Sequence, residues 1–276
     1  MTVQNSSTAL SLPPVHTLWV GSELGPLELL CIKSWLRQGH EVFVHSYERI
    51  PLPEGAKSFD ASALCSPRKV FRNRNGSLAP FSDVYRVLIL QAYPVLWLDT
   101  DVFLLRPFDF GPNVIVKEGN GSDARANNSV MRLRQDHPIL LEVLNRWQRP
   151  WKAIPWDHPR KAWPVITMGA TSFGLHAKHL PWGALGSLAM EKCIRENGFD
   201  GAVLGFERSL TAHRVDLFSA LADANVFLQD PIVYVHLYRS QLKRDLANPV
   251  PGSVYARLWE IGARQQDALA KGSEPI

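Results

Sequence analysis

Residues 93–110 read YPVLWLDTDVFLLRPFDF, a run of apolar side chains broken in its middle by Asp99 and Asp101. The run VLWL just before the first aspartate is typical of a buried strand. Residues two apart in an extended chain face the same side, so the two carboxylates can converge on one point. Since an unpaired buried carboxylate is costly, the pair indicates a chemical role at the end of this strand.

The segments before this stretch predict a parallel sheet. Residues 15–21 (VHTLWVG) and 41–47 (EVFVHSY) have strand signals, and LGPLELLCIKSWLRQGH between them has helical periodicity that ends at Gly39. A strand, a helix and a strand at this spacing form a βαβ unit with parallel strands. A further helix is expected over PFSDVYRVLILQAY, directly before the aspartate strand.

The rest of the chain predicts more elements of an α/β domain. Residues 51–79 are rich in Pro, Gly, Ser and Arg and predict a long loop that contains at most one short helix. Strand signals follow in NVIVKE, NNSVMRLR and DPIVYVHLYRS, and HPILLEVLNRWQ predicts an amphipathic helix. We therefore predict one large α/β domain over residues 15–245, a frayed leader over 1–14, and a C-terminal helix and tail over 246–276.

The composition bounds the class of protein. The chain has 276 residues, 46% of them hydrophobic, and a formal net charge of +4, which favour a globular protein and do not require nucleic acid as a partner. Cys31, Cys65 and Cys193 are odd in number and lack a CxxC pattern, which favours a reducing, cytoplasmic setting over a disulfide framework. No stretch approaches about 18 uninterrupted apolar residues, so no membrane span is expected.

Asp99 and Asp101 would lie at the carboxyl edge of the sheet, where open α/β sheets bind their ligands. Two converging carboxylates suit Mn²⁺ or Mg²⁺ and leave open positions for phosphate oxygens. The alternative is a pair of ordinary surface carboxylates in a turn, because a lone DxD pattern is weak. The apolar context of the pair favours metal binding.

Asp83 and Arg86 lie at i and i+3 of the helix before this strand and therefore share one face. A carboxylate accepts hydrogen bonds from sugar hydroxyls, and a guanidinium holds a phosphate or sugar oxygen with several donors. Taken alone, the two residues would more often form an intrahelical ion pair worth about 0.2–0.5 kcal/mol.

Six segments together resemble glycosyltransferase family 32. They occur in the family's order over roughly residues 15–240 and read WVG, FSDVYRVLIL, WLDTDVFLLRPF, NNSVMRLRQDHPIL, TMGATSFG and VHLYRS. The family holds α1,4-galactosyltransferases, fungal initiating α-mannosyltransferases and many bacterial transferases for capsule and lipopolysaccharide, and large glucosylating toxins are similar around the aspartates. The resemblance implies a GT-A fold, which is a Rossmann-like, mostly parallel twisted sheet flanked by helices, with a helical and loop-rich acceptor lobe.

The resemblance also implies metal-dependent transfer of a hexose from a nucleotide sugar, with retention of anomeric configuration. It implies that Trp19, beside the backbone of Val20 and Gly21, contacts the nucleotide base. It further implies that Asp83 and Arg86 hold the donor sugar.

The metal and diphosphate contacts implied by the resemblance lie on two segments. Asp99 would face the ribose and the metal, and Asp101 would bind the metal directly and bridge to the diphosphate. His236, followed by Ser240, would add a metal or diphosphate contact from a loop that closes over the donor. A lone histidine at a strand end is more often structural, and its place in the ordered series of segments favours the functional role.

Asn128 and Gly169 match segments that line the sugar and acceptor side in the family. The alternatives are a simple turn for the asparagine and a backbone with positive φ for the glycine. The chain also departs from the family, because Tyr93-Pro94 replaces a Gly-Gly pair before the aspartate strand and Gly169-Ala170 replaces a Gly-Pro pair.

The implied partners are a nucleotide sugar, with UDP-hexose favoured over GDP-mannose, and a glycan or lipid-linked acceptor in cell-surface polysaccharide or lipopolysaccharide synthesis. Residues 147–182 hold five tryptophans among prolines and basic residues, which suits acceptor sugars or peripheral contact with the inner face of a membrane, besides packing. Two other functions stay open. One is a sugar nucleotidyltransferase, for which GSELGPLE is a poor phosphate-binding loop, and the other is an inactive sugar-nucleotide or glycan-binding protein.

Overall fold

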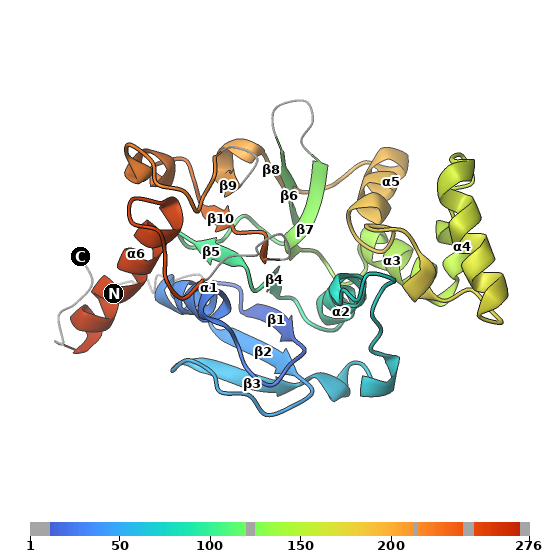
Figure 1. Cartoon of the computed structure of the whole chain (residues 1–276), viewed down its shortest axis with the longest axis horizontal. Coiled ribbons are helices and arrows are strands. Elements are labelled where there is room, and N and C mark those ends of the chain that lie inside the picture. The colour runs from blue at the N-terminus through green and yellow to red at the C-terminus, as the bar shows by residue number, and fades with distance from the viewer. Residues whose placement is uncertain (1–11, 120–124, 212–214, 240–245, 271–276) are drawn as a thin grey trace, which may run out of the picture.

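The computed structural model describes residues 12–119, 125–211, 215–239 and 246–270 (Figure 1). The larger sheet has seven strands in the order β3-β2-β1-β4-β7-β6-β8. These strands are β1 (Val15–Trp19), β2 (Val42–Ser46), β3 (Ala56–Asp60), β4 (Leu96–Leu98), β6 (Val114–Glu118), β7 (Arg125–Arg132) and β8 (Ala202–Leu204). The smaller sheet has the order β5-β10-β9, with β5 (Val102–Leu104), β9 (Ser209–Thr211) and β10 (Tyr234–His236).

The described residues hold six α-helices, and those nearest the larger sheet flank it, whereas the helices over residues 159–171 and 254–270 lie at the two ends of the molecule (Figure 1). The six helices are α1 (Pro26–Arg37), α2 (Ala79–Ala92), α3 (Pro138–Gln148), α4 (Pro159–Thr171), α5 (Ser187–Asn197) and α6 (Val254–Ala270). Short 3₁₀ helices are η1 (Ala61–Ala63), η2 (Pro67–Lys69), η4 (Pro150–Ala153), η5 (Ala177–His179), η6 (Phe206–Arg208) and η7 (Ala224–Leu228). Within the described residues, no helix is both long enough and apolar enough to cross a bilayer.

Most strands of the larger sheet are parallel, which confirms the predicted α/β class. Strands β3, β2, β1 and β4 run in one direction, and β7 runs antiparallel to both β4 and β6. Because β2 and β4 lie on opposite sides of β1, the strand order reverses between β1 and β4. Open α/β sheets bind ligands beyond the carboxyl ends of strands at such a switch point.

Strand β4 shows why a short central strand is wholly apolar. Leu96 and Leu98 pack in a core with α1 and α6, whereas Trp97 packs in a second core with α2, α3 and α5. Successive side chains of a strand point to opposite faces, so a strand covered on both faces by helices needs apolar residues at every position. Full burial of one such leucine contributes about 2 kcal/mol.

The aspartates do not interrupt a single strand. The Val102 amide donates to the Asp99 carbonyl at 3.0 Å, and this turn separates β4 of the larger sheet from β5 of the smaller one. Strand β5 then pairs antiparallel with β10, with Val102 opposite His236. The Asp-Thr-Asp turn is therefore the junction between the two sheets.

One segment differs from the prediction, and a second contains a helix that was not predicted individually. Strand β3 lies within residues 51–79, which predicted a loop, and it pairs in parallel with β2. Its sequence AKSFD has few β-forming residues, so its pairing at the sheet edge, and not local propensity, makes it a strand. Helix α4 lies within residues 147–182, where Pro159 occupies the first turn, a position that proline tolerates.

Buried histidines link β1, β2 and α2. His16 Nδ1 lies 2.8 Å from His45 Nε2, and His45 Nδ1 lies 3.0 Å from the Tyr85 hydroxyl. Burial lowers the pKa of His16 to about 4, and burial together with His16 lowers the pKa of His45 to about 3. Both side chains therefore stay neutral in the folded protein at a pH where free histidines take up protons.

We expect this pair to make the protein sensitive to acid. Because the unfolded chain binds more protons, the free energy of unfolding should fall as the pH drops from 6.5 toward 4, by up to about 1.4 kcal/mol per pH unit for each histidine. Urea titrations at pH 7, 6, 5 and 4.5 measure this slope, and His45→Gln should reduce it. The exposed His158→Gln is the control, and an unchanged slope in His45→Gln would argue against the assignment.

Candidate active site

One edge of the larger sheet brings together three residues that sequence patterns singled out, Trp19, Asp99 and Asn128, with one that they did not, Glu118. Trp19 ends β1 and Asp99 follows β4, and these two strands are parallel neighbours. Strand β6 runs in the same direction and ends at Glu118. Because β7 runs the opposite way, its first half brings Asn128 to this same edge.

Arg86 is the centre of a buried network at this edge. Its Nη2 lies 3.1 Å from Asp99 Oδ1 and 3.3 Å from Asp83 Oδ1. Its Nη1 donates to the Asn128 carbonyl, and the guanidinium lies 5.1 Å from the centre of the Trp97 ring. Asn128 Nδ2 closes the network by donating to Asp83 Oδ1 at 2.8 Å. Arg86 therefore contacts more than Asp83, its neighbour on α2. It also links α2 to Asp99, which follows β4, and to Asn128 on β7.

The network contains two carboxyls with perturbed pKa values. Burial, opposed by Arg86 and aided by Asp101, raises the pKa of Asp99 to about 6. Burial also raises the pKa of Asp83, against the effects of Arg86 and Asn128. Perturbed carboxyls beside a fixed guanidinium are typical of functional sites, although structural ion-pair networks also produce them.

Asp101 faces the smaller sheet. Its Oδ1 lies 3.5 Å from His236 Nε2, and its Oδ2 accepts the Arg239 amide at 2.8 Å. Burial acts to raise the pKa of Asp101, but His236 and the Arg239 amide hold it below the ordinary value. Burial alone would lower the pKa of His236, whereas Glu118 and Asp101 raise it well above the usual range.

Glu118 is a residue that the sequence analysis missed. It is 5% exposed, and its carboxylate accepts hydrogen bonds from His236 Nδ1 at 2.8 Å and from the Tyr238 hydroxyl at 2.8 Å. The Tyr234 hydroxyl donates at 3.0 Å and Asn127 Nδ2 at 2.7 Å. Although burial acts in the other direction, His236 and the tyrosines hold the pKa of Glu118 below its ordinary value. The sequence feature that could have identified Glu118 is its position as an acidic residue at the end of the apolar strand NVIVKE.

The donor set around Asp101 fits a divalent cation that arrives with phosphates. Among the described residues, no three His, Cys, Asp or Glu side chains form a ready-made metal site. Mg²⁺ is commonly held by one or two carboxylates and the phosphates of a substrate, without a cage made by the protein alone. A histidine that binds metal usually donates its other ring N–H to a carboxylate, as His236 Nδ1 does to Glu118.

Trp19 has an unsatisfied donor at the same edge. Its indole Nε1 is buried and has no hydrogen-bond partner among the described residues. A Cβ added at Gly21 would lie 3.1 Å from this atom, so the Gly21 backbone packs closely on the indole. Val20 is partly buried against the core that contains α2.

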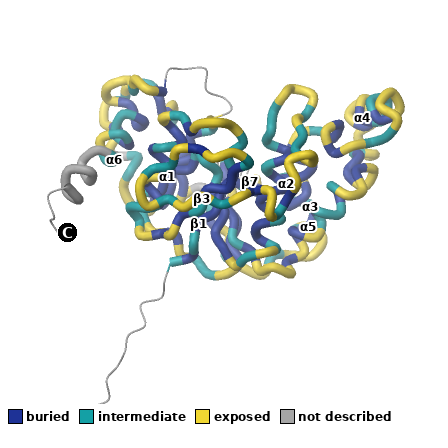
Figure 2. Tube along the Cα trace, turned by 90° about the horizontal axis from the view of Figure 1, so that it is seen from below, coloured by how far each residue is buried: buried dark blue, intermediate teal, exposed yellow. Residues whose placement is uncertain are grey.

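One predicted site residue lies elsewhere. Gly169 is on α4, where an added Cβ would lie 3.3 Å from Leu175 Cδ1, and it has a helical backbone in place of the positive φ considered for it. Figures 1 and 2 both place α4 at one end of the molecule, away from β1. Ser240 lies outside the described residues.

Gly186 approaches the Arg86 network from the start of α5. An added Cβ would lie 2.7 Å from both Asn128 Nδ2 and Asp83 Oδ2, which is too close for either polar group to keep its place. No sequence pattern assigned a role to this glycine. The small size of Gly186 allows the helical lobe, which is formed by α3, α4 and α5, to pack against the candidate site.

We expect Gly186→Ala to displace Asn128 and Asp83 and to lower the free energy of unfolding by about 1–3 kcal/mol. Urea denaturation measures the loss, and the adjacent Ser187→Ala is the matched control. In an Asn128→Ala background, one of the two clashes is gone, so Gly186→Ala should cost less. Strict additivity of the two substitutions would contradict this explanation.

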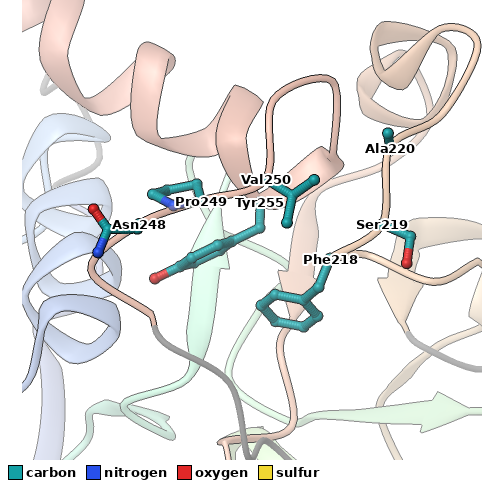
Figure 3. Close-up of a pocket in the computed structure, with 7 residues that line it drawn as sticks. All are labelled: Phe218, Ser219, Ala220, Asn248, Pro249, Val250 and Tyr255. Atoms are coloured by element: carbon teal, nitrogen blue, oxygen red, sulfur yellow. The ribbon is translucent and has the colours of Figure 1, made fainter.

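A separate pocket of about 620 Å³ lies near the start of α6 (Figure 3). Its seven lining residues are all uncharged, and they are Phe218, Ser219, Ala220, Asn248, Pro249, Val250 and Tyr255. All seven are distinct from the networks around Asp99 and Asp101. A diphosphate needs cationic partners, so the sheet edge is the better candidate for binding it.

Comparisons with known proteins give matches only among solved structures. No protein-family model matches the chain, and no curated protein matches its sequence. The chain is similar to the PaToxG glycosyltransferase, with a TM-score of 0.40 and 14% identity, over 67% of this chain and 84% of that one.

Two further similar structures are glycosyltransferase domains of the YGT toxin. The ligand-free domain has a TM-score of 0.45 and 10% identity, over 70% of this chain and 80% of that one. The UDP-bound domain has a TM-score of 0.39 and 10% identity, over 95% of this chain and 78% of that one. Because all three TM-scores lie below 0.5, function has to be argued from the site, and membership of glycosyltransferase family 32 stays a prediction.

Proposed function

We propose that the protein is a retaining glycosyltransferase that moves a hexose from a nucleotide sugar, with UDP-hexose favoured, to a glycan or lipid-linked acceptor. Mn²⁺ or Mg²⁺ would be held by Asp99 and Asp101, and by His236 once its Nε2 gives up the proton that Asp101 and Glu118 favour, because a histidine binds metal only through a deprotonated nitrogen. The observation that carries the proposal is the pair of buried networks joined at the Asp-Thr-Asp turn, one through Arg86 and the other through His236. They meet at the switch point of a parallel sheet, which is where such folds bind nucleotides.

A bound cation would supply positive charge against the leaving diphosphate. Glu118 holds the His236 ring so that Nε2 faces Asp101, and the Arg239 amide fixes the other oxygen of Asp101. Arg239 itself is tied to α1, because its Nε lies 3.1 Å from Glu28 Oε1. These contacts orient the carboxylate before the donor binds.

The Arg86 network would bind the sugar. Asp83 accepts and Asn128 donates hydrogen bonds, so the pair suits sugar hydroxyls, and Arg86 adds a fixed positive charge beside them. The acceptor hydroxyl would attack from the face that the nucleotide leaves, and its proton would pass to the departing diphosphate. A role in cell-surface polysaccharide or lipopolysaccharide synthesis is part of this proposal and depends on the acceptor.

The nucleotidyltransferase alternative is less well supported. Such an enzyme would use the start of α1 to hold phosphates, because helix N-termini attract anions. Here the buried Glu28 lies in the first turn of α1, and an added Cβ at Gly25 would lie 2.5 Å from Glu28 Oε2. A carboxylate therefore already occupies the start of this helix.

The test is a thermal-stability screen of UDP- and GDP-sugars, each with Mn²⁺, Mg²⁺ or chelator. A ligand at 100 times its Kd stabilises the native state by about 2.7 kcal/mol, so the correct donor should raise the Tm only when a cation is present. That donor should then be hydrolysed slowly without acceptor. Stabilisation without hydrolysis would indicate an inactive binding protein, and no stabilisation by any nucleotide sugar would overturn the proposal.

A further inference from the structure

Exposed aromatic side chains are concentrated in one segment of the chain. Five of them are between 55% and 102% exposed, and they are Trp151, Trp156, Trp163, Phe173 and Trp182. Where the structure describes side chains, these are all of the exposed tryptophans and phenylalanines. Phe173 also has a positive φ of 54°, which is uncommon for a bulky residue. Large apolar side chains gathered at a surface mark an interaction site.

The same segment carries excess positive charge. Between residues 149 and 182, one acidic residue, Asp157, stands against five basic ones, which are Arg149, Lys152, Arg160, Lys161 and Lys178. All five basic residues are exposed. Five positive charges and one negative charge leave +4, which equals the formal net charge of the whole chain.

Helix α4 shows how these residues are directed outward. Its buried residues, Ala162, Val165 and Gly169, are spaced as one helical face and pack toward the protein. Arg160 and Trp163 are three residues apart on an exposed face. Figure 1 and the view turned by 90° in Figure 2 place α4 at the end of the molecule opposite α6.

We propose that residues 149–182 dock on the surface of an anionic lipid bilayer. Tryptophan prefers the interface between headgroups and acyl chains, and each Lys or Arg near an anionic bilayer contributes about fivefold to partitioning. The charge of the segment complements lipid phosphates. The exposed rings are spread over η4, α4 and the loops around them, which suits a broad bilayer surface better than a single sugar. The binding is peripheral and does not depend on the proposed transferase activity.

Co-sedimentation of the full chain with vesicles tests the proposal. Vesicles of phosphatidylcholine with phosphatidylglycerol should bind the protein, and binding should weaken with salt and on pure phosphatidylcholine. The double substitution R160Q/K161Q should lower the partition coefficient about 25-fold, at about fivefold for each charge. W163S/F173S should also lower it, because the buried apolar area is lost.

Matched substitutions elsewhere on the surface are the controls. R72Q/R74Q removes two exposed basic residues, and V203S/V250S removes two apolar side chains that are 43% and 46% exposed. Both control pairs should bind vesicles within about twofold of the wild type. Circular dichroism of every variant checks the fold.

Three results would overturn the proposal. The first is that the wild-type protein fails to bind anionic vesicles. The second is that both the W163S/F173S and the R160Q/K161Q variants bind these vesicles as well as the wild type does. The third is that W163S/F173S keeps vesicle binding and loses affinity for a soluble oligosaccharide acceptor, which would assign the surface to glycan. Thermal stabilisation by nucleotide sugars, measured in parallel, distinguishes failure of this surface from failure of the proposed transferase.

Discussion

Asp101→Asn should lower cation-dependent hydrolysis of the nucleotide-sugar donor by about 10³-fold or more, while the fold stays intact by circular dichroism. Asp101 lies where the two networks meet, 3.5 Å from His236 Nε2, with its other oxygen held by the Arg239 amide. Asparagine has nearly the same shape but no charge, and one of its two terminal groups is an N–H donor. Asp101→Asn should therefore lower activity and cation affinity much more than it lowers the free energy of unfolding.

The control for this substitution is Asp109→Asn, which removes a carboxylate from a more exposed ion pair with Arg132. It should keep wild-type activity, because exposed ion pairs contribute little. Wild-type hydrolysis by Asp101→Asn, or by the wild-type protein in excess chelator, would contradict the role given to Asp101.

Glu118→Gln should have the largest combined effect on stability and on cation binding. Glu118 accepts hydrogen bonds from His236, Tyr234, Tyr238, Asn127 and Ser129, with donor–acceptor distances between 2.7 and 3.3 Å. Glutamine offers one acceptor oxygen and turns an NH₂ group toward some of these donors. We expect the free energy of unfolding to fall by about 3 kcal/mol, because the substitution breaks a buried charge pair.

The same substitution should weaken Mn²⁺ binding in the presence of UDP by about 10–100-fold, because His236 loses the carboxylate that orients it. Glu142→Gln is a matched control, since Glu142 forms ion pairs with Arg146 and Lys192 in the helical lobe. It should destabilise the protein modestly and leave Mn²⁺ affinity unchanged. If Glu118→Gln destabilised the protein and bound Mn²⁺ like the wild type, Glu118 would have only a structural role.

Local patterns predicted the central part of the fold. The βαβ unit through β1, α1 and β2 follows from strand and helix periodicities, and the continuous apolar run of β4 indicated a strand covered on both faces. Strand β3 was not predictable in this way, because AKSFD forms a strand by pairing with β2. The two aspartates predicted a functional position after β4. The location of the Asp-Thr-Asp turn between two sheets was not predictable, because it depends on the pairing of β5 with β10, which is distant in sequence.

The candidate site was predictable to the extent that its residues lie near one another in sequence. Asp83 and Arg86 share a helical face, and Asp99 and Asp101 share a turn, so their proximity follows from local geometry. The partners that complete the networks are distant in sequence. Glu118 contacts His236, which is 118 residues away, and Gly186 packs against Asn128 and Asp83. Such contacts depend on how the strands pair, which local patterns do not specify.

Binding of Mn²⁺ to the full chain, followed by electron paramagnetic resonance with and without UDP, tests the central claim most directly. The protein should remove about one equivalent of free Mn²⁺ when UDP is present, as expected for a cation that phosphates and one or two carboxylates hold together. Asp101→Asn should lose this binding, and Asp109→Asn should keep it. A free Mn²⁺ signal that the wild-type protein leaves unchanged with UDP and with GDP would contradict the proposed cation-dependent nucleotide-sugar site.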